Sequence, residues 1–289
     1  MTSTAGSTTP LADRTPVTRA AVITHGKAQT IGPALARLQA VAQEQGVELL
    51  YAVDEARKHR LPSSEEAGPP ADLAVVLGGD GTMLRALTRF HGTLTPVLGV
   101  NFGRVGFLSS VGPDDLEAGV GRAFAGEFDV IELPTIDVEV DDKHQLAVND
   151  LVVTSAVVGR MVEIAWSVGG EELGMQGCDG VVCSTPSGST AYNLSNGGPV
   201  LVWGLDALVV TFIAAHSLHA RPLVVPRSRE VVFWNRTADV AVSVLVDGHR
   251  VSDVGTDGRI VARLGAQPSL LATLPEVTFL RRYGQTFAS

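Results

Sequence analysis

The chain of 289 residues is long enough for one large or two ordinary domains with a buried core. Its hydrophobic fraction of 45% and its charged fraction of 18% are typical of a soluble globular protein. The formal net charge of −9 argues against non-specific binding of nucleic acid, because phosphate backbones are met with basic surfaces, but it leaves room for a local site for a small anion.

The N-terminus and the cysteines indicate a cytoplasmic protein. Residues 1–16 are expected to form a disordered tail, since the first nine lack the basic start and the apolar stretch of a targeting segment. The most apolar window, residues 200–215, is shorter than the about 20 residues of a membrane span and is expected to be buried core. Cys178 and Cys183 match no zinc or redox spacing, which favours reduced thiols. We therefore expect neither a membrane nor a nucleic acid as a partner.

The first part of the chain alternates apolar strands with amphipathic helices. Residues 54–70, which contain prolines and glycine, are expected to form an exposed loop. This alternation predicts an α/β domain over residues 17–127 with a parallel sheet, whose ligand sites lie at the carboxyl ends of the strands. The expected strands are 20–23, 47–53, 73–77 and 96–100, and the expected helices are 31–43, one that opens at Thr82, and 113–124.

The strand at 73–77 runs directly into Gly-Gly-Asp-Gly-Thr at residues 78–82. Glycines let a ligand approach the backbone, and the free amides of the following helix favour an anion, so this turn is typical of phosphate binding. Phosphate binding alone does not explain the carboxylate of Asp80, because its charge has the same sign as that of phosphate. It could take a proton from an attacking hydroxyl, or it could hold a Mg²⁺ that bridges phosphates. The alternative is that Asp80 only caps the helix in an ordinary turn.

From about residue 128 the pattern changes to the alternation typical of antiparallel β structure. Asp247 and Gly248 form the dipeptide of a tight hairpin turn. We therefore expect a β-rich domain over residues 128–275. Its expected strands are 135–140, 146–154, 162–168, 231–234 and 240–246.

Polar residues interrupt this β-rich part at two places. Asn149 and Asp150 lie inside an apolar predicted strand, where at least one must face inward and have a partner such as a ribose; the alternative is a strand edge or a short turn. Residues 179–199 are too polar for core, and their hydroxyls, glycines and Tyr192 suit a nucleoside site; the alternative is a surface loop with a helix cap.

Two histidines, His216 and His219, are spaced for a metal only if their segment is helical. With no third ligand in view, a structural role is favoured over a metal site.

Taken in order, five segments resemble the NAD kinase family, whose members phosphorylate the adenosine 2′-hydroxyl of NAD to make NADP. The first motif alone is shared with lipid kinases, whereas the Ser/Thr-rich stretch that ends in Gly-Gly-Pro is specific to this family. The resemblance runs from about Val17 to the C-terminus. It implies an active site in the cleft between the two domains and a C-terminal segment, 276–289, that packs back on the N-terminal domain. The segments are 78–82, 101–108, 149–150, 179–199 and 216–222.

The resemblance implies roles for the residues of the first motif. Asp80 would be the general base on the 2′-hydroxyl, and Gly81 and Arg85 would lie along the nucleotide. The phosphate-donor loop would comprise Gly78, Gly79, Gly81 and Thr82.

The resemblance also implies an NAD-binding set in the second part of the chain. Asn149 and Asp150 would hold the ribose or adenine, and Asp179 the nicotinamide end. Asp150 stands where the family usually has Glu, Cys178 where many relatives have Gly, and Ala215 where they have Pro. The remaining residues of the set are Thr190, Ala191, Tyr192, Asn193, Leu194 and Ser195 of the adenosine pocket, with Arg160 and Asp247 as weaker matches.

The family further implies Mg²⁺ or another divalent cation without a dedicated protein site, NAD and either ATP or polyphosphate as substrates, and a homodimer or homotetramer. Two other classes stay open from the sequence. A diacylglycerol-type lipid kinase shares the first motif, and a non-catalytic nucleotide-sensing module would bind NAD without turnover.

Overall fold

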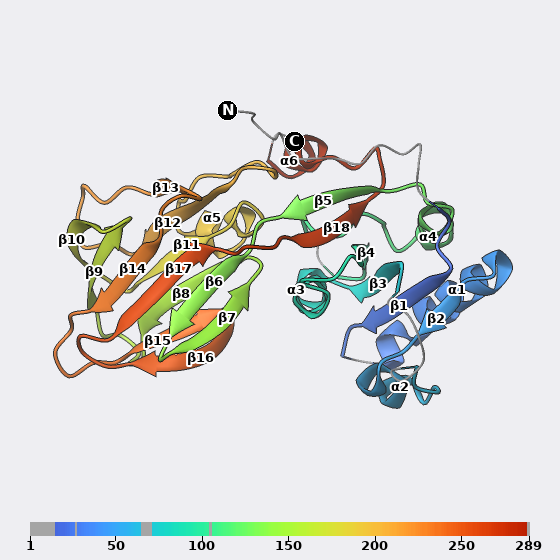
Figure 1. Cartoon of the computed structure of the whole chain (residues 1–289), viewed down its shortest axis with the longest axis horizontal. Coiled ribbons are helices and arrows are strands. Elements are labelled where there is room, and N and C mark those ends of the chain that lie inside the picture. The colour runs from blue at the N-terminus through green and yellow to red at the C-terminus, as the bar shows by residue number, and fades with distance from the viewer. Residues whose placement is uncertain (1–14, 27, 65–70, 104–105, 288–289) are drawn as a thin grey trace. The chain divides into compact units, whose positions relative to one another are not determined.

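The computed structural model describes residues 15–26, 28–64, 71–103 and 106–287, and it divides the chain into two compact units (Figure 1). Unit 1 comprises Met1–Glu132 and Ser269–Ser289, and unit 2 comprises Leu133–Pro268. The expected tail at residues 1–16 lies outside the described residues except for its last two positions.

Unit 1 is built on one sheet with the strand order β2-β1-β3-β4-β18-β5, in which the neighbours from β2 to β18 pair in parallel. Helices follow the first strands in turn, which confirms the predicted α/β class (Figure 1). The strands are β1 (Arg19–Thr24), β2 (Glu48–Leu50), β3 (Leu73–Gly78), β4 (Val97–Asn101), β5 (Asp129–Leu133) and β18 (Ser269–Thr273). The helices are α1 (Ala28–Gln45), α2 (Val53–His59), α3 (Asp80–Arg89), α4 (Leu116–Phe124) and α6 (Phe279–Phe287).

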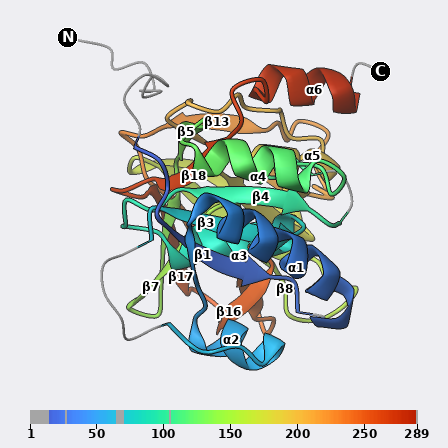
Figure 2. The ribbon, with the colours of Figure 1, turned by 90° about the vertical axis from the view of Figure 1, so that its right-hand side faces the viewer.

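Helices pack on both faces of this sheet. Leu73, Val75 and Leu77 of β3 join a core that also contains the apolar stripes of α1 and α4, which lie side by side in Figure 2. The alternate residues of β3 point to the other face, where α3 packs so closely that a Cβ on Gly99 would lie 2.6 Å from the Met83 sulfur. Every residue of β3 is buried, as a strand covered on both faces requires.

Unit 2 is a sandwich of two antiparallel sheets with the strand orders β10-β9-β14-β17-β6-β7 and β13-β12-β11-β8-β15-β16. One hydrophobic cluster contains residues from both sheets, so their inner faces pack against each other. The first sheet contains β6 (Ile136–Val140), β7 (Lys143–Ala147), β9 (Val162–Val168), β10 (Glu171–Cys178), β14 (Val231–Asn235) and β17 (Arg259–Leu264). The second contains β8 (Asp150–Ser155), β11 (Gly180–Ser184), β12 (Ala207–Ile213), β13 (Leu223–Pro226), β15 (Val242–Val246) and β16 (His249–Val254).

The predicted hairpin at residues 247–248 is confirmed. Asp247 and Gly248 both have positive φ, at 47° and 79°, and join β15 to β16. This is the backbone that a two-residue turn of the mirror-image type requires.

In unit 1 the structure corrects three predictions. The boundaries expected at 128 and 275 move to 133 and 268, because β5 and β18 belong to the first sheet. The loop expected at 54–70 begins with α2, whose acidic first turn and basic last turn complement the helix dipole; residues 65–70 lie outside the described residues. The third helix opens at Asp80 rather than at Thr82.

In unit 2 two further predictions are wrong. The strand expected at 146–154 is broken at Val148 and Asn149 into β7 and β8. The polar stretch expected to be excluded from the core contains β11, and residues 180–189 are all buried. Buried hydroxyls are tolerated there because the fold supplies partners for them, as with the Thr185 hydroxyl, which donates to the Val148 carbonyl at 2.7 Å.

Within the described part of the chain, no helix combines the length and the apolar character needed to cross a membrane.

Candidate active site

The turn between β3 and α3 is as tight as its glycines suggest. A Cβ on Gly78 would lie 2.6 Å from the Thr82 hydroxyl oxygen, so a side chain there would collide with the first turn of α3. Gly79 is the N-cap residue, and Gly81 is exposed on the first turn of the helix. Thr82, by contrast, is 8% exposed and faces the sheet. The backbone of Gly79 and Gly81 is therefore open to an anion, whereas the Thr82 side chain is not placed to contact one.

The Asp80 carboxylate lies against the loop that follows β4. The Phe107 amide donates to Oδ2 at 3.1 Å, and Oδ1 has no hydrogen-bond partner in the part of the chain that the structure describes. A Cβ on Gly106 would come within 2.2 Å of the carboxylate, so only glycine permits this approach. The α3 N-cap makes no side-chain hydrogen bond. The alternative that Asp80 only caps its own helix is therefore wrong.

Burial raises the pKa of Asp80 above its ordinary value, because the charged form loses its hydration. The amides of Phe107 and Leu108 and the guanidinium of Arg282 act in the opposite direction. A carboxylate with a raised pKa and an unpartnered oxygen, at the carboxyl end of a parallel strand, is a candidate general base. Within the motif at 101–108, residues 104 and 105 lie outside the described residues.

Arg85 on α3 is directed toward the end of β1 rather than toward the Asp80 carboxylate. Its guanidinium donates to the Thr24 carbonyl at 2.7 Å and to Glu55 Oε1 at 3.1 Å. Glu55 is 1% exposed and also accepts from Lys58 at 2.8 Å. The sequence analysis missed Glu55 because its helix was expected to be a loop. The acidic start and basic end of residues 53–59 are the signal that identifies that helix.

In unit 2 the Asp247 carboxylate holds the break between β7 and β8. It accepts from the amides of Val148 and Asn149, both at 2.8 Å, and from the Asp150 amide at 3.2 Å. The strand ladder is interrupted at Val148 and Asn149, and a carboxylate is used in its place. Asp247, a weaker match in the sequence, therefore builds the backbone on which Asn149 and Asp150 stand.

Asn149 and Asp150 differ in their surroundings. The Asn149 side chain is half-buried and accepts from the Ser187 hydroxyl at 3.2 Å. Asp150 is 5% exposed, and burial together with the nearby Asp247 carboxylate raises its pKa to about 7. The expectation that both residues lie inside one strand is wrong, since Asn149 lies in the break and Asp150 begins β8. The prediction that an inward polar side chain lies here is confirmed by Asp150.

Asp150→Asn is expected to stabilise the protein at neutral pH relative to the wild type, with no such gain at acid pH. The folded pKa of about 7 lies above the unfolded value, so the folded state retains a proton that the unfolded chain has lost. The contribution of Asp150 to stability therefore falls as the pH rises from about 4 to about 7, by up to about 4 kcal/mol at about 1.4 kcal/mol per pKa unit. Urea unfolding of both proteins between pH 4 and 8 measures this, and a difference independent of pH would contradict it.

The NAD-binding residues expected at 190–195 fall into three groups by their exposure to solvent. Tyr192 and Ser195 are exposed on the short helix α5 (Tyr192–Ser195), which follows a turn of 3-10 helix at Gly188–Thr190. Asn193 is fully buried, and its amide is used inside the fold. The residues of this set that remain partly open are Thr190, Ala191 and Leu194.

The Asn193 side chain forms its hydrogen bonds inside the fold, so the predicted contact of this residue with NAD stays a prediction. Its amide nitrogen donates to the carbonyls of Ser189 and Pro199, both at 3.0 Å, and its oxygen accepts from Thr211 at 2.7 Å. A Cβ on Gly198 would lie 2.0 Å from that oxygen, so the Gly-Gly-Pro sequence is needed to let the chain pass.

The remaining candidates lie on turns of unit 2. Arg160 is exposed in the turn after β8, and Asp179 is exposed between β10 and β11, where its carbonyl accepts from Thr154 at 2.9 Å. His216 and His219 lie in an irregular segment rather than in a helix, and the described residues contain no group of three metal-ligating side chains. The roles of Arg160 and Asp179 stay predictions, as does a shared cleft.

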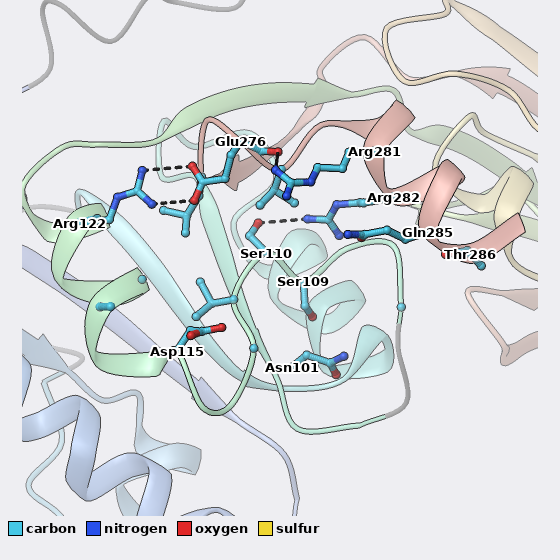
Figure 3. A pocket seen from close by; sticks show the side chains of 17 residues that line it. Asn101, Ser109, Ser110, Asp115, Arg122, Glu276, Arg281, Arg282, Gln285 and Thr286 are labelled. Atoms are coloured by element: carbon cyan, nitrogen blue, oxygen red, sulfur yellow. Dashed lines mark hydrogen bonds and ion pairs between the residues drawn. The ribbon is translucent and has the colours of Figure 1, made fainter. Parts of the chain in front are cut away.

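Unit 1 contains a pocket of about 600 Å³ at the carboxyl ends of β4 and β18, under α6 (Figure 3). Gly106, which contacts Asp80, and Arg282, which lowers its pKa, both line it. The sequence analysis missed Arg282. The spacing of Phe279, Tyr283 and Phe287 along one helix face is the signal for the helix that carries it.

Two family models match the chain: the ATP-NAD kinase N-terminal domain over residues 33–128 and the ATP-NAD kinase C-terminal domain over residues 148–273. The NAD kinase of Gemmatimonas aurantiaca is 38% identical over 220 residues, which cover 74% of this chain and 76% of that protein. The NAD kinase 2 of Streptomyces coelicolor is 38% identical over 257 residues, which cover 84% of this chain and 84% of that protein.

Solved structures of similar proteins share the fold. A yeast NADH kinase complexed with NADH has a TM-score of 0.82 at 22% identity, and the match covers 95% of this chain and 89% of that chain. At this level of identity the match shows that the two proteins share a fold and nothing more. An NAD kinase from Archaeoglobus fulgidus in complex with ATP has a TM-score of 0.74 at 26% identity, covering 93% of this chain and 97% of that chain. On these matches and on its two-unit architecture, the chain belongs to the ATP-NAD kinase family.

Proposed function

We propose that the protein is an NAD kinase that transfers the terminal phosphoryl group of ATP to the adenosine 2′-hydroxyl of NAD. The observation that carries this proposal is the Asp80 carboxylate, buried after a glycine turn with one oxygen unpartnered. A buried acceptor without a donor is costly, and the 2′-hydroxyl would supply that donor. The relatives named NAD kinase and the structural neighbour in complex with ATP support the same pair of substrates.

In this reaction Asp80 accepts the proton of the 2′-hydroxyl as its oxygen attacks the terminal phosphorus. A new bond forms between that oxygen and phosphorus, and the bond from phosphorus to the bridging oxygen of ATP breaks, which releases ADP. The backbone amides at Gly79 and Gly81 are placed to stabilise phosphate charge. The raised pKa of Asp80 suits the task, since it makes this carboxylate a stronger base than an ordinary aspartate.

A divalent cation, with Mg²⁺ the first choice, fits this donor set as an ion carried by the phosphates of ATP. Mg²⁺ in such sites keeps several waters and relies on substrate phosphates more than on a protein cage, and the described residues contain no cluster of three metal-ligating side chains. When bound, the ion neutralises charge on the transferred group.

On the NAD side, we assign the ribose and adenine to the surface built by Asn149 and the exposed residues of α5. Tyr192 offers a half-exposed ring on which a base can stack, and Ser195 offers an exposed hydroxyl. Asp179 and Arg160 are assigned the nicotinamide end and a peripheral contact. Asp150 and Asp247 support this surface from within rather than by exposed contacts.

We also propose a cytoplasmic homodimer or homotetramer, as the family resemblance implies. Cys178 and Cys183 are free and buried, and burial raises the pKa of both thiols to about 12, which keeps them unreactive and suits a reducing compartment.

The experiment that tests the function is incubation of the purified protein with a divalent cation, a phosphate donor and an acceptor. ATP and polyphosphate are compared as donors, and NAD, NADH and diacylglycerol as acceptors, with NADP measured by an NADP-dependent dehydrogenase. We expect NADP from NAD and ATP. Phosphorylated diacylglycerol, or binding of NAD without turnover under every donor, would contradict the proposal.

A further inference from the structure

The C-terminal helix α6 packs on the loop that contacts Asp80. The Phe107 ring lies 5.9 Å from the Phe279 ring and 5.7 Å from the Phe287 ring, measured between centroids. Tyr283 stacks on Phe279 and makes a tilted contact with Phe287. Such contacts fix the position of Phe107. The Phe107 amide donates to the Asp80 carboxylate, so Phe107 links α6 to the candidate base.

Arg282 extends from the buried face of α6 into this loop. It is 6% exposed, and its guanidinium donates to the Phe107 carbonyl and to the Ser110 hydroxyl, the latter at 3.2 Å (Figure 3). Both acceptors are neutral. A guanidinium buried to this degree is costly unless an opposite charge lies nearby.

Among the described residues, the Asp80 carboxylate interacts electrostatically with Arg282. Burial lowers the pKa of Arg282 to about 10, and Asp80 acts against that fall; Arg282 in turn lowers the pKa of Asp80. Two other charged groups near Arg282 and Asp80 have partners elsewhere, whereas Asp115 lines the same pocket as an exposed carboxylate. Glu276 accepts two hydrogen bonds from Arg122 (Figure 3). On α3, the Arg85 guanidinium is directed to Glu55.

We propose that Arg282 is a positioning residue for the phosphoryl-transfer reaction: it holds the Phe107 backbone against the Asp80 carboxylate and balances the charge of that carboxylate. The proposal rests on the assignment of Asp80 as the base. One guanidinium thus performs two tasks, because it anchors the carbonyl of the residue whose amide contacts Asp80 and also supplies the opposite charge. Helix α6, about 200 residues further along the chain than Asp80, thereby influences the position and the protonation of the Asp80 carboxylate.

Kinetics against pH test this role with Arg282→Met, Arg282→Lys and the control Arg281→Met, whose residue is exposed on the same helix. Without the guanidinium, Asp80 should hold its proton to higher pH. We expect Arg282→Met to move the acid limb of kcat/KM upward by about one pH unit, with an activity loss of about tenfold on that limb that recovers at higher pH. The KM for NAD should stay within about threefold, Arg282→Lys should restore most of the profile, and Arg281→Met should match the wild type.

A profile of Arg282→Met whose acid limb coincides with that of the wild type would overturn the proposal. So would a loss that is uniform across pH and not restored by Arg282→Lys. If the Met variant is too unstable for kinetics, Ser110→Ala removes one anchor of the guanidinium and keeps its charge, and a smaller shift in the same direction is expected.

A thermal measurement separates failure of this inference from failure of the proposed function, since it requires no turnover. In the wild-type background, Asp80→Asn removes a buried carboxylate but leaves Arg282 buried without its opposite charge, so Tm should change little. In the Arg282→Met background the same change removes an uncompensated carboxylate and should raise Tm. Equal effects of Asp80→Asn in both backgrounds would contradict the coupling, whatever the enzyme's substrates are.

Discussion

Asp80→Asn is expected to lower kcat at least about 10²-fold while the affinity for NAD stays close to that of the wild type. The amide has nearly the same shape as the carboxylate and can still accept from the Phe107 amide, so the loop and the binding surface are kept. It cannot take a proton from the 2′-hydroxyl. Steady-state kinetics with ATP and NAD give the rate, and calorimetric titration with NAD gives the affinity.

Asp114→Asn is the matched control, because Asp114 is an exposed carboxylate of the same unit. It removes the same charge and should leave kcat within about twofold, which is the expectation for a surface substitution. Near-normal turnover of Asp80→Asn would eliminate the general-base assignment. A loss of NAD binding equal to the loss of rate would instead make Asp80 a binding group.

The β3–α3 turn was predictable because its signals are local. Five consecutive apolar residues, a run of glycines and a periodic apolar pattern specify a buried strand, a tight turn and a helix within 15 residues or so of chain. The environment of Asp80 was not predictable in this way. It is set by the Phe107 amide and by Arg282, whose positions follow from the packing of α6 on unit 1 rather than from any spacing near residue 80.

The polar residues of unit 2 show a different limit of sequence reasoning. An inward-facing polar side chain at 149–150 was predicted from strand alternation, but its neighbour Asp247 lies about 100 residues away and is brought there by the pairing of β8 with β15. The polar stretch at 179–199 was expected to lie outside the core, because composition counts hydroxyls without knowing whether the fold supplies partners. Asn193 has three such partners and is fully buried.

Asp247→Ala is expected to lower the free energy of unfolding by about 3–5 kcal/mol and to raise the KM for NAD. The carboxylate accepts from three consecutive amides, and its loss leaves these donors without their acceptor where the strand ladder is already broken. Relief of the repulsion with Asp150 offsets part of the loss, since Asp247 contributes to the raised pKa of that residue. Urea unfolding at pH 7 and NAD kinetics measure the two effects.

Two variants separate the lost hydrogen bonds from the backbone conformation. Asp247 has a φ of 47°, at which alanine is strained by about 1 kcal/mol or more. Asp239 has a φ of 58° and is exposed, so Asp239→Ala carries the same strain and should cost only that amount. Asn at position 247 tolerates the positive φ and keeps one acceptor oxygen. The free energy of unfolding that Asp247→Asn loses should therefore lie between the losses of the two alanine variants. Equal losses for Asp247→Ala and Asp239→Ala would show that the turn conformation, and not the carboxylate, holds Asn149 and Asp150 in place.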